Sequence, residues 1–239
     1  QLNESYRLPE QISQLANALI HWKKIQEDPE ETSDIESASH QLSFLTPVWE
    51  NGHMDQILAA MKRFFQNTLE EGQTDKQEDI AILVCEIEED GWPVLEMLEQ
   101  LKLPYQANFE SRHIHNALKY NHEHHHPTGC DFEMDVEKMR RGLKANFYAR
   151  SGRIKVCTIH SFKGWELDHV IVVFNPRRKN GICEVSLLYT AITRSTNQLT
   201  IYNADEEYKK FSEYAAEQGL IKLLSPTTAE ALNAVRGGD

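Results

Sequence analysis

The sequence predicts an α/β protein with a mostly parallel sheet and helices on both of its faces. Short apolar runs that are typical of buried strands, such as 79–84 (DIAILV) and 169–174 (HVIVVF), alternate with segments of helical periodicity such as 53–72. Alternating strands and helices favour parallel strands, because a crossover through a helix returns the chain in the same direction. In such folds the sites lie at the carboxyl ends of the strands, where residues 158–166 are expected.

Each element follows from a local pattern. In 8–20, apolar residues recur at helical spacing behind Pro9, and 53–72 repeats the pattern up to Gly72, which is typical of a helix stop. The other helices are expected at 92–105 (running into an extended segment), 136–150, 184–195, 205–218 and near 227–235. Strands are expected at 42–49, 79–84, 154–159, 169–174 and 198–203. We expect one large domain at 1–222, with a reduced irregular insertion at about 108–150, and a C-terminal tail at 223–239.

Composition describes an ordinary globular chain of 239 residues with 40% hydrophobic and 26% charged residues. No apolar run approaches the roughly 20 residues that a membrane-spanning helix needs, so a membrane span is excluded. The first residues lack the pattern of a signal peptide, and without an initiator Met the chain reads as an excised piece or a processed product. Its four cysteines are far apart and form no CxxC pair, which favours a reducing, cytoplasmic compartment.

The net charge of −12 weighs against a free-standing nucleic-acid binder, which would normally carry a basic face. Part of the acidic excess is local, in the loop-like stretch 27–36 (EDPEETSDIE). A basic groove can also be supplied by another domain. The net charge therefore argues against nucleic-acid binding but does not exclude it.

The segment 158–166 (TIHSFKGWE) crowds polar side chains at a strand-to-loop junction. Its candidate site residues are Thr158, His160, Ser161, Lys163, Gly164 and Glu166. Lys163 and Gly164 suit a compact cationic turn, and Glu166 offers a carboxylate for a hydroxyl or a cation. Taken alone, His160 is more simply an ordinary polar residue, so the segment is a plausible crevice loop that other segments must complete.

Two arginines are further candidates. Arg194 lies nearly opposite the apolar face of the helix expected at 184–195, although an ordinary surface arginine is the simpler interpretation. Arg7 precedes the first helix at its N-terminal edge, where anions are favoured. The chain has no GxxxxGK[ST] phosphate loop and no HExxH, GxSxG or zinc-finger spacing. The histidine run in 121–127 (NHEHHHP) follows no recognised ligand spacing and is expected to be a flexible loop.

Three segments in this order resemble motifs IV, V and VI of the UvrD/Rep/PcrA-like superfamily 1 DNA helicases. They are 2–20 (LNESYRLPEQISQLANALI), 155–173 (KVCTIHSFKGWELDHVIVV) and 187–202 (LLYTAITRSTNQLTIY). The stretch 78–105 also resembles the passage between these motifs. The resemblance implies the C-terminal RecA-like domain of such a helicase, a three-layer α/β/α version of the P-loop NTPase fold without the phosphate loop itself.

The resemblance also implies roles for the candidate residues. Arg7 and Arg194 would reach the γ-phosphate of ATP, which, with Mg2+, would be held mainly by a missing N-terminal RecA-like domain of the same protein. Glu166 would accept a hydrogen bond from the ribose hydroxyl, with Gly164 beside it. Tyr6 would lie near the base or serve packing, and both roles stay open.

The single-stranded DNA contacts would come from the same strand-end loop. They are assigned to Thr158, His160 and Ser161, with Lys163 positioning the loop or neighbouring phosphates. The chain departs from the family pattern at Ser5, Trp165 and Ser195–Thr196, and residues 108–150 are too few for the large insertion domain of well-known members. Two alternatives remain: a non-catalytic helicase-like module that binds a protein or nucleic acid, and a metal-dependent enzyme using the histidine run.

Overall fold

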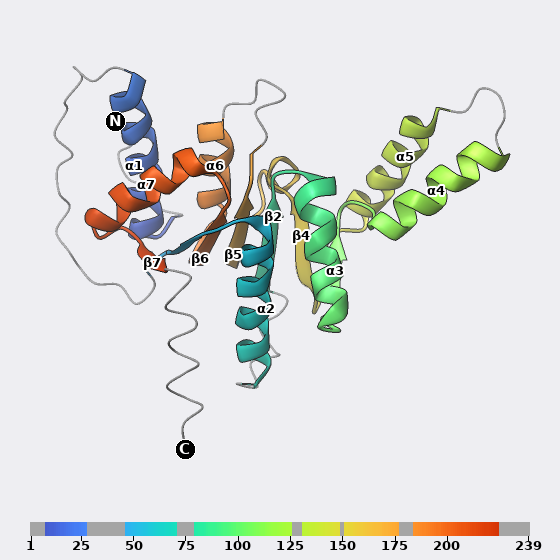
Figure 1. Cartoon of the computed structure of the whole chain (residues 1–239), viewed down its shortest axis with the longest axis horizontal. Helices are drawn as coiled ribbons and strands as arrows, with labels where there is room; N and C mark the ends of the chain where they lie inside the picture. Colours follow the sequence, from blue (N-terminus) through green and yellow to red (C-terminus); the bar gives the residue numbers. More distant parts are fainter. Residues whose placement is uncertain are drawn as a thin grey trace.

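A seven-stranded sheet forms the centre of the chain in the computed structural model, in the order β3-β4-β2-β5-β6-β1-β7 (Figure 1). The structure describes residues 8–27, 46–70, 79–125, 131–148, 151–176 and 184–224. The strands are β1 (Val48–Asn51), β2 (Ile80–Val84), β3 (Tyr105–Ala107), β4 (Ile154–Thr158), β5 (Leu167–Phe174), β6 (Ser195–Asn203) and β7 (Lys222–Leu224). All strand pairs among the described residues are parallel. The predicted α/β class with a parallel sheet is confirmed.

Helices cover both faces of this sheet. One face packs against α1 (Glu10–Glu27), α6 (Glu184–Ile192) and α7 (Glu206–Glu217), and the other against α2 (Met54–Glu70) and α3 (Trp92–Gln100). Strand β2 shows why two layers are needed, because all five of its residues are buried and they alternate between the two cores. Within the described part of the chain, no helix is long and apolar enough to cross a membrane.

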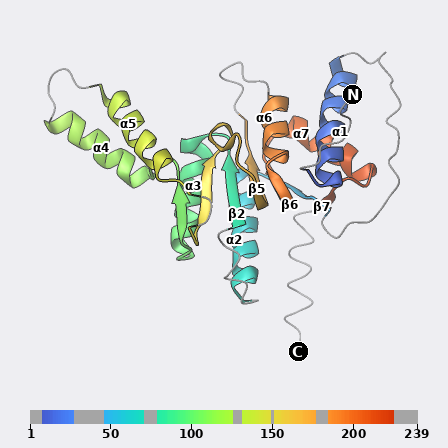
Figure 2. The same cartoon turned by 180° about the vertical axis from the view of Figure 1, so that it is seen from behind.

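Two further helices, α4 (Arg112–His125) and α5 (Phe132–Ala145), form an antiparallel hairpin between β3 and β4. Figures 1 and 2 show this arm projecting from the β3 edge, away from the layered body. The expectation of irregular structure at 108–150 was therefore wrong, although the basic helix predicted at 136–150 exists as α5. A polar helix such as α4 was hard to recognise, because only a narrow face of it packs against α5.

A buried carboxylate fixes the base of this arm. Arg140 of α5 donates from Nε and Nη2 to the Glu110 carboxylate at 2.7 and 2.5 Å, and His115 Nδ1 lies 3.1 Å from it. Burial alone would raise the pKa of Glu110, but the hydrogen bonds from Arg140, from the backbone and from His115, with the charge of Arg140, together hold that pKa below its ordinary value. Trp92 Nε1 donates to the Glu110 carbonyl at 2.9 Å and so ties the arm to α3.

Several helix and strand boundaries differ from those predicted. The helix expected at 184–195 ends at Ile192, so Arg194 lies in a turn before β6 instead of on a helix face. The strand expected at 42–49 begins at Val48, and 42–45 lies outside the described residues, as does the helix expected near 227–235. Strand β7, which pairs with β1, was not expected from the sequence.

One half-buried histidine, His169, gives the fold a defined response to acid. His169 of β5 lies with Nε2 3.2 Å from Thr200 Oγ1, and its ring meets Phe64 of α2 edge-on at 5.4 Å. Burial disfavours the charged imidazolium and lowers the pKa of His169 to about 4. Because the unfolded chain takes up this proton near pH 6.5, the folded state is penalised as the pH falls from 6.5 towards 4.

We predict that in His169→Gln the free energy of unfolding decreases less between pH 7 and pH 4.5 than it does in the wild type. The wild-type penalty reaches at most about 3 kcal/mol once the pH is below the folded pKa, and the variant lacks it. Urea unfolding of both chains at the two pH values gives the comparison. His53→Gln, at an exposed position, is the matched control and should follow the wild type. Parallel pH profiles for wild type and His169→Gln would contradict the prediction.

Candidate functional site

The connection between β4 and β5 runs from the carboxyl ends of the strands, called here the carboxyl edge of the sheet, to their amino ends, called the amino edge. Thr158, the last residue of β4, is level with Val84 of β2, and Val84 is level with Val173 of β5. Leu167 starts β5 six residues before Val173, and at about 3.3 Å per residue this is roughly 20 Å. Residues 158–166 were expected at the carboxyl edge as a whole, but only their first part lies there. Because β4 and β5 run in the same direction on either side of β2, the connection must return to the opposite ends of the strands.

A 3-10 turn and a β-turn make this crossing. The turn η3 (Ile159–Phe162) follows β4 directly, and Trp165 N then donates to the Phe162 carbonyl at 3.0 Å. Lys163 has φ −57° and ψ 123°, and Gly164 has φ +91°. These angles describe a type II turn, whose third position requires a positive φ and so favours glycine. The compact turn predicted at Lys163–Gly164 is confirmed.

Trp165 anchors this turn to the core. Its ring lies 5.7 Å from Phe147 in an edge-on arrangement and 6.4 Å from Phe162. Phe147 follows α5, so the turn and the end of the arm share one aromatic contact. The large ring at 165, which departs from the family pattern, therefore has a structural role in this chain.

At the carboxyl edge, Thr158 Oγ1 donates to Ser161 Oγ at 2.9 Å, and His160 is exposed. The predicted residues of this group thus lie together at the end of β4. The neighbouring strand ends carry a buried acid that sequence reasoning missed. Asp90 accepts hydrogen bonds from Glu86 N (3.0 Å) and from Asn175 Nδ2 (2.8 Å), which joins the loops after β2 and β5.

Asp90 could have been noticed because it belongs to an acidic run between a buried strand and a helix (CEIEEDGW). It lies in η2 (Ile87–Gly91), a π-helical turn that leads into α3. Nearby, burial raises the pKa of the Cys85 thiol well above its usual value, and it also raises that of Cys157. Neither thiol is poised as a nucleophile, because the thiolate is disfavoured at both positions.

At the amino edge, the structure brings Glu166 and Arg194 to neighbouring strand starts. The Leu167 amide donates to the Arg194 carbonyl at 3.2 Å, and Leu167 pairs with Ser195 in the sheet. Glu166 is exposed immediately before Leu167. Two residues predicted to serve one nucleotide are therefore close in space although they are 28 positions apart.

The Arg194 guanidinium folds back on the end of α6. Its Nε donates to the Thr190 carbonyl at 3.1 Å and its Nη2 to Thr193 Oγ1 at 3.1 Å. The Thr190 carbonyl also accepts from Thr193 Oγ1 at 3.1 Å, and a cation at this position suits the negative end of the helix dipole. The side chain is half-buried, and these two contacts occupy two of its five donors.

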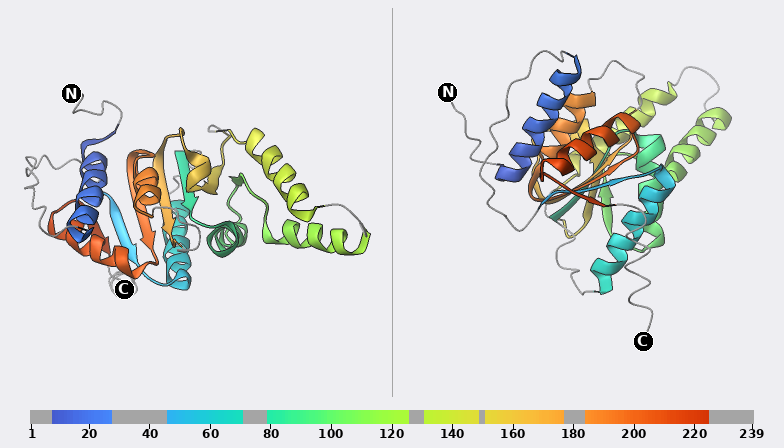
Figure 3. Two further views of the ribbon diagram at one scale, coloured as in Figure 1. Left: turned by 90° about the horizontal axis from the view of Figure 1, so that it is seen from above. Right: turned by 60° about the vertical axis from the view of Figure 1, so that its left-hand side comes forward.

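Helix α1 points its start towards the same edge. Near its other end, Lys23 forms an ion pair at 2.7 Å with Glu207, at the start of α7 and beyond the carboxyl end of β6. Figure 3 shows α1 lying alongside α6 in both views. Tyr6 and Arg7, the two site residues predicted just before α1, lie outside the described residues.

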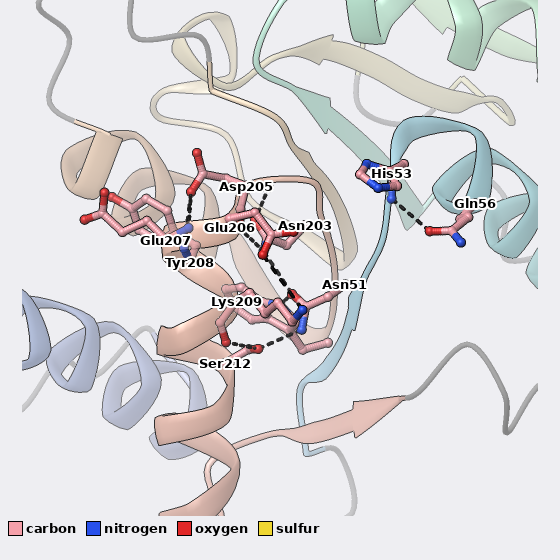
Figure 4. A network of polar contacts seen from close by, with 11 residues as sticks. Asn51, His53, Gln56, Asn203, Asp205, Glu206, Glu207, Tyr208, Lys209 and Ser212 are labelled. Carbon is pink, nitrogen blue, oxygen red and sulfur yellow. Dashed lines mark hydrogen bonds and ion pairs between the residues drawn. The ribbon is translucent and has the colours of Figure 1, made fainter.

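A pocket of about 350 Å³ opens at the carboxyl ends of β1 and β6. Figure 4 shows the polar network beside it, in which Asn203 Nδ2 donates to Asn51 Oδ1 (2.9 Å) and Asn51 Nδ2 to Ser212 Oγ (2.8 Å). The Asp205 carboxylate accepts from two amides of the first turn of α7. These groups bind one another, so they clamp α7 to the sheet and do not form a catalytic pair.

The histidine run is helical where the structure describes it. Residues 121–125 form the last part of α4, which contradicts the expected loop, and His126 lies outside the described residues. His124 Nδ1 lies 2.8 Å from the Tyr120 carbonyl, and the His122 ring meets Phe132 edge-on at 5.8 Å. Among the described residues, no group of three or more His, Cys, Asp or Glu side chains could hold a metal ion.

Comparison with known proteins supports the resemblance over part of the chain. Residues 154–202 match the model of the UvrD-like helicase C-terminal domain, so the resemblance stated from the sequence is confirmed over the segment that holds Thr158, Glu166 and Arg194. No match was found among curated proteins. The fold is similar to the C-terminal domain of a possible DNA helicase from Lactobacillus plantarum WCFS1, at 16% identity and a TM-score of 0.42, covering 84% of this chain and 88% of that one. A likeness of this strength supports no inference about the site.

We predict that Gly164→Ala destabilises the chain by about 1–2 kcal/mol. No atom would meet the new Cβ within 4 Å, so the cost is the strain of a positive φ in a residue with a side chain.

Gly142→Ala is the matched control, because that glycine also has open space around it but lies inside α5. There alanine should stabilise the chain by about 0.5–1 kcal/mol. Urea unfolding measures both variants, and the prediction fails if the two substitutions shift the midpoint in the same direction.

Proposed function

We propose that this chain is the C-terminal motor domain of an ATP-dependent DNA helicase or translocase. One observation carries the proposal: in the segment that matches the helicase family, eight residues join two edges of the sheet that each carry candidate contacts. The partners would be single-stranded DNA and the N-terminal RecA-like domain of the same protein. The dispersed cysteines are compatible with action in the cytoplasm.

The amino edge would face the nucleotide. Glu166 is an exposed carboxylate that can accept from a ribose hydroxyl, with Gly164 beside it, and Arg194 can offer a fixed cation to phosphate oxygens. Tyr6 and Arg7, which precede α1, are proposed to complete this group. The chain has no phosphate loop, so ATP and Mg2+ would be held mainly by the N-terminal domain, and ATP hydrolysis would supply the free energy.

The present contacts of Arg194 suit a residue that acts only in the assembled cleft. Hydrogen bonds of a charged donor, such as those from Arg194 to Thr190 and Thr193, typically contribute at most about 1.5–3 kcal/mol each. Charge-assisted hydrogen bonds to phosphate oxygens in a desolvated cleft are stronger. Arg194 would therefore leave the helix end only when a nucleotide and the other domain close on it, and it would then offset charge that develops on the transferred phosphoryl group.

The carboxyl edge would face the DNA strand. Thr158 and Ser161 offer hydroxyls, and the exposed His160 ring can stack on a base or donate to the backbone. The exposed Lys163 lies in the turn between the two edges and can bind a phosphate of either ligand. A shift of Glu166 at the amino edge would be transmitted through η3 to the carboxyl edge. The nucleotide that is bound would thereby change the affinity for the DNA strand.

We predict that Arg194→Ala lowers the DNA-stimulated ATPase kcat of the protein containing both motor domains by about 10³-fold. The physical reason is loss of the cation that offsets charge in the transition state. Steady-state hydrolysis with and without single-stranded DNA measures the effect.

Arg63→Ala is the matched control, because Arg63 lies on α2, on the other face of the sheet, and should leave kcat unchanged. A purely structural role for Arg194 would appear as a lower urea midpoint with normal turnover at low temperature. Turnover equal to the wild type in Arg194→Ala would rule out the assigned role.

A further inference from the structure

The basic residues of this acidic chain are concentrated in one acid-free segment. Between Glu137 and Glu166 there are 28 residues without a single Asp or Glu, although the chain holds 37 of them. The same 28 residues contain eight of the 25 Lys and Arg residues. This segment runs from the middle of α5 to the type II turn, so it links the arm to the proposed strand-binding loop.

Three of these cations lie on the exposed side of α5. Lys138, Arg141 and Lys144 are exposed, whereas Val136 and Leu143 on the other side are turned towards α4 and the body. Arg141 has a distant ion pair with Glu137 at 3.8 Å, and its side chain is 67% exposed. Such a pair contributes little, so the guanidinium remains available to an anion.

The helix dipole does not account for this pattern. It favours acids in the first turn and bases in the last, which explains Glu133 and Lys144. Lys138 and Arg141 lie further inside the helix, and the exposed Arg153 lies beyond its end. The macrodipole therefore does not account for all of these cations.

Two groups of contacts hold the described parts of the path from α5 to the loop. Phe147 packs edge-on against Trp165 at 5.7 Å, which places the end of the arm against the type II turn. Lys155 is buried, and its Nζ donates to the Arg153 carbonyl (3.1 Å), to Gln106 Oε1 (3.2 Å) and to Ser151. These contacts hold residues 151–155 against β3, next to the exposed Arg153.

We propose that the exposed face of α5, together with Lys163, forms a second nucleic-acid contact that continues the strand path from the 158–163 loop onto the arm. The cations Lys138, Arg141 and Lys144 neutralise backbone phosphates, and Tyr148, 61% exposed beyond the end of α5, offers a ring for a base. The inference rests on the proposed function in that the loop also binds the strand.

Charge and position favour nucleic acid over an acidic protein as the occupant. A polyanion with evenly spaced phosphates can follow cations that extend from Lys138 to Lys163, whereas an acidic patch on a protein would need to match only part of them. The exposed aromatic residue within the basic run adds a stacking surface that suits single-stranded bases.

The test uses the 239-residue chain, a labelled oligo-dT strand and a blunt duplex of the same length, in fluorescence anisotropy titrations at several salt concentrations. The arm variant is Lys138→Glu/Arg141→Glu/Lys144→Glu. Its control is Lys209→Glu/Lys210→Glu/Lys222→Glu, which makes the same change of net charge at exposed positions of α7 and β7. We expect at least tenfold weaker strand binding in the arm variant and a salt slope lower by about 2, since each single-strand phosphate contact contributes roughly 0.7.

Equal losses in the arm variant and the control would overturn the inference, as would no salt-dependent binding of either oligonucleotide by the wild type. If the Glu variant fails to fold, Lys138→Gln/Arg141→Gln/Lys144→Gln takes its place, and urea unfolding checks that this variant is folded. Tyr148→Ala should weaken strand binding more than duplex binding. His160→Ala, which changes the loop and leaves Lys163 in place, separates the two proposals: a loss there with a normal arm variant supports only the loop contact, and the reverse result supports only the arm.

Discussion

The position of β2 between β4 and β5 is the constraint on which this molecule depends. Two parallel strands on either side of a third cannot be joined by a tight turn, so the connection must recross the sheet, roughly 20 Å here. Most such crossovers use a helix of a dozen residues, but this one uses a 3-10 turn and a type II turn. The short connection is rigid, and it therefore fixes the distance between the two edges.

Rigidity of this connection has a functional consequence. A flexible loop would absorb a displacement at one end, whereas a short segment anchored by Trp165 against Phe147 and Phe162 transmits it. The backbone hydrogen bond from Leu167 to Arg194 couples the same segment to the end of α6. Any ligand that moves the α6 end therefore acts on the loop directly, without a longer network.

The sequence predicted the layered body well, because its strands and helices bury whole faces. Continuous apolar runs such as 80–84 are unambiguous, since both faces of the strand are covered. The arm was missed because α4 buries only a narrow face: of its central residues, Leu118 is half-buried, whereas Asn116, Ala117 and Lys119 are exposed. The true position of Arg194 was missed because helix periodicity does not show where the helix ends, and no glycine marks that end.

The site was predictable as residue types but not as geometry. The pattern TIHSFKGWE identifies a glycine turn and the residues around it, yet a linear pattern cannot show that Thr158 and Glu166 lie at opposite edges. That separation depends on strand order, which follows from packing between distant segments. Asp90 was overlooked for the same reason, because its partner Asn175 is 85 positions away.

Net charge misleads when charges are segregated, and this chain shows how. At −12 the whole chain should repel a polyanion, but a screened interaction extends only about 10 Å at ordinary ionic strength. A phosphate beside α5 therefore responds to the nearby cations more than to the acids across the sheet. The exposed acids of α5, Glu133, Asp135 and Glu137, all precede Lys138 in the helix, and Glu110 is neutralised by Arg140 at the base of the arm. An acidic chain can thus present a local cationic path, which guides a strand to one face and leaves the others repulsive.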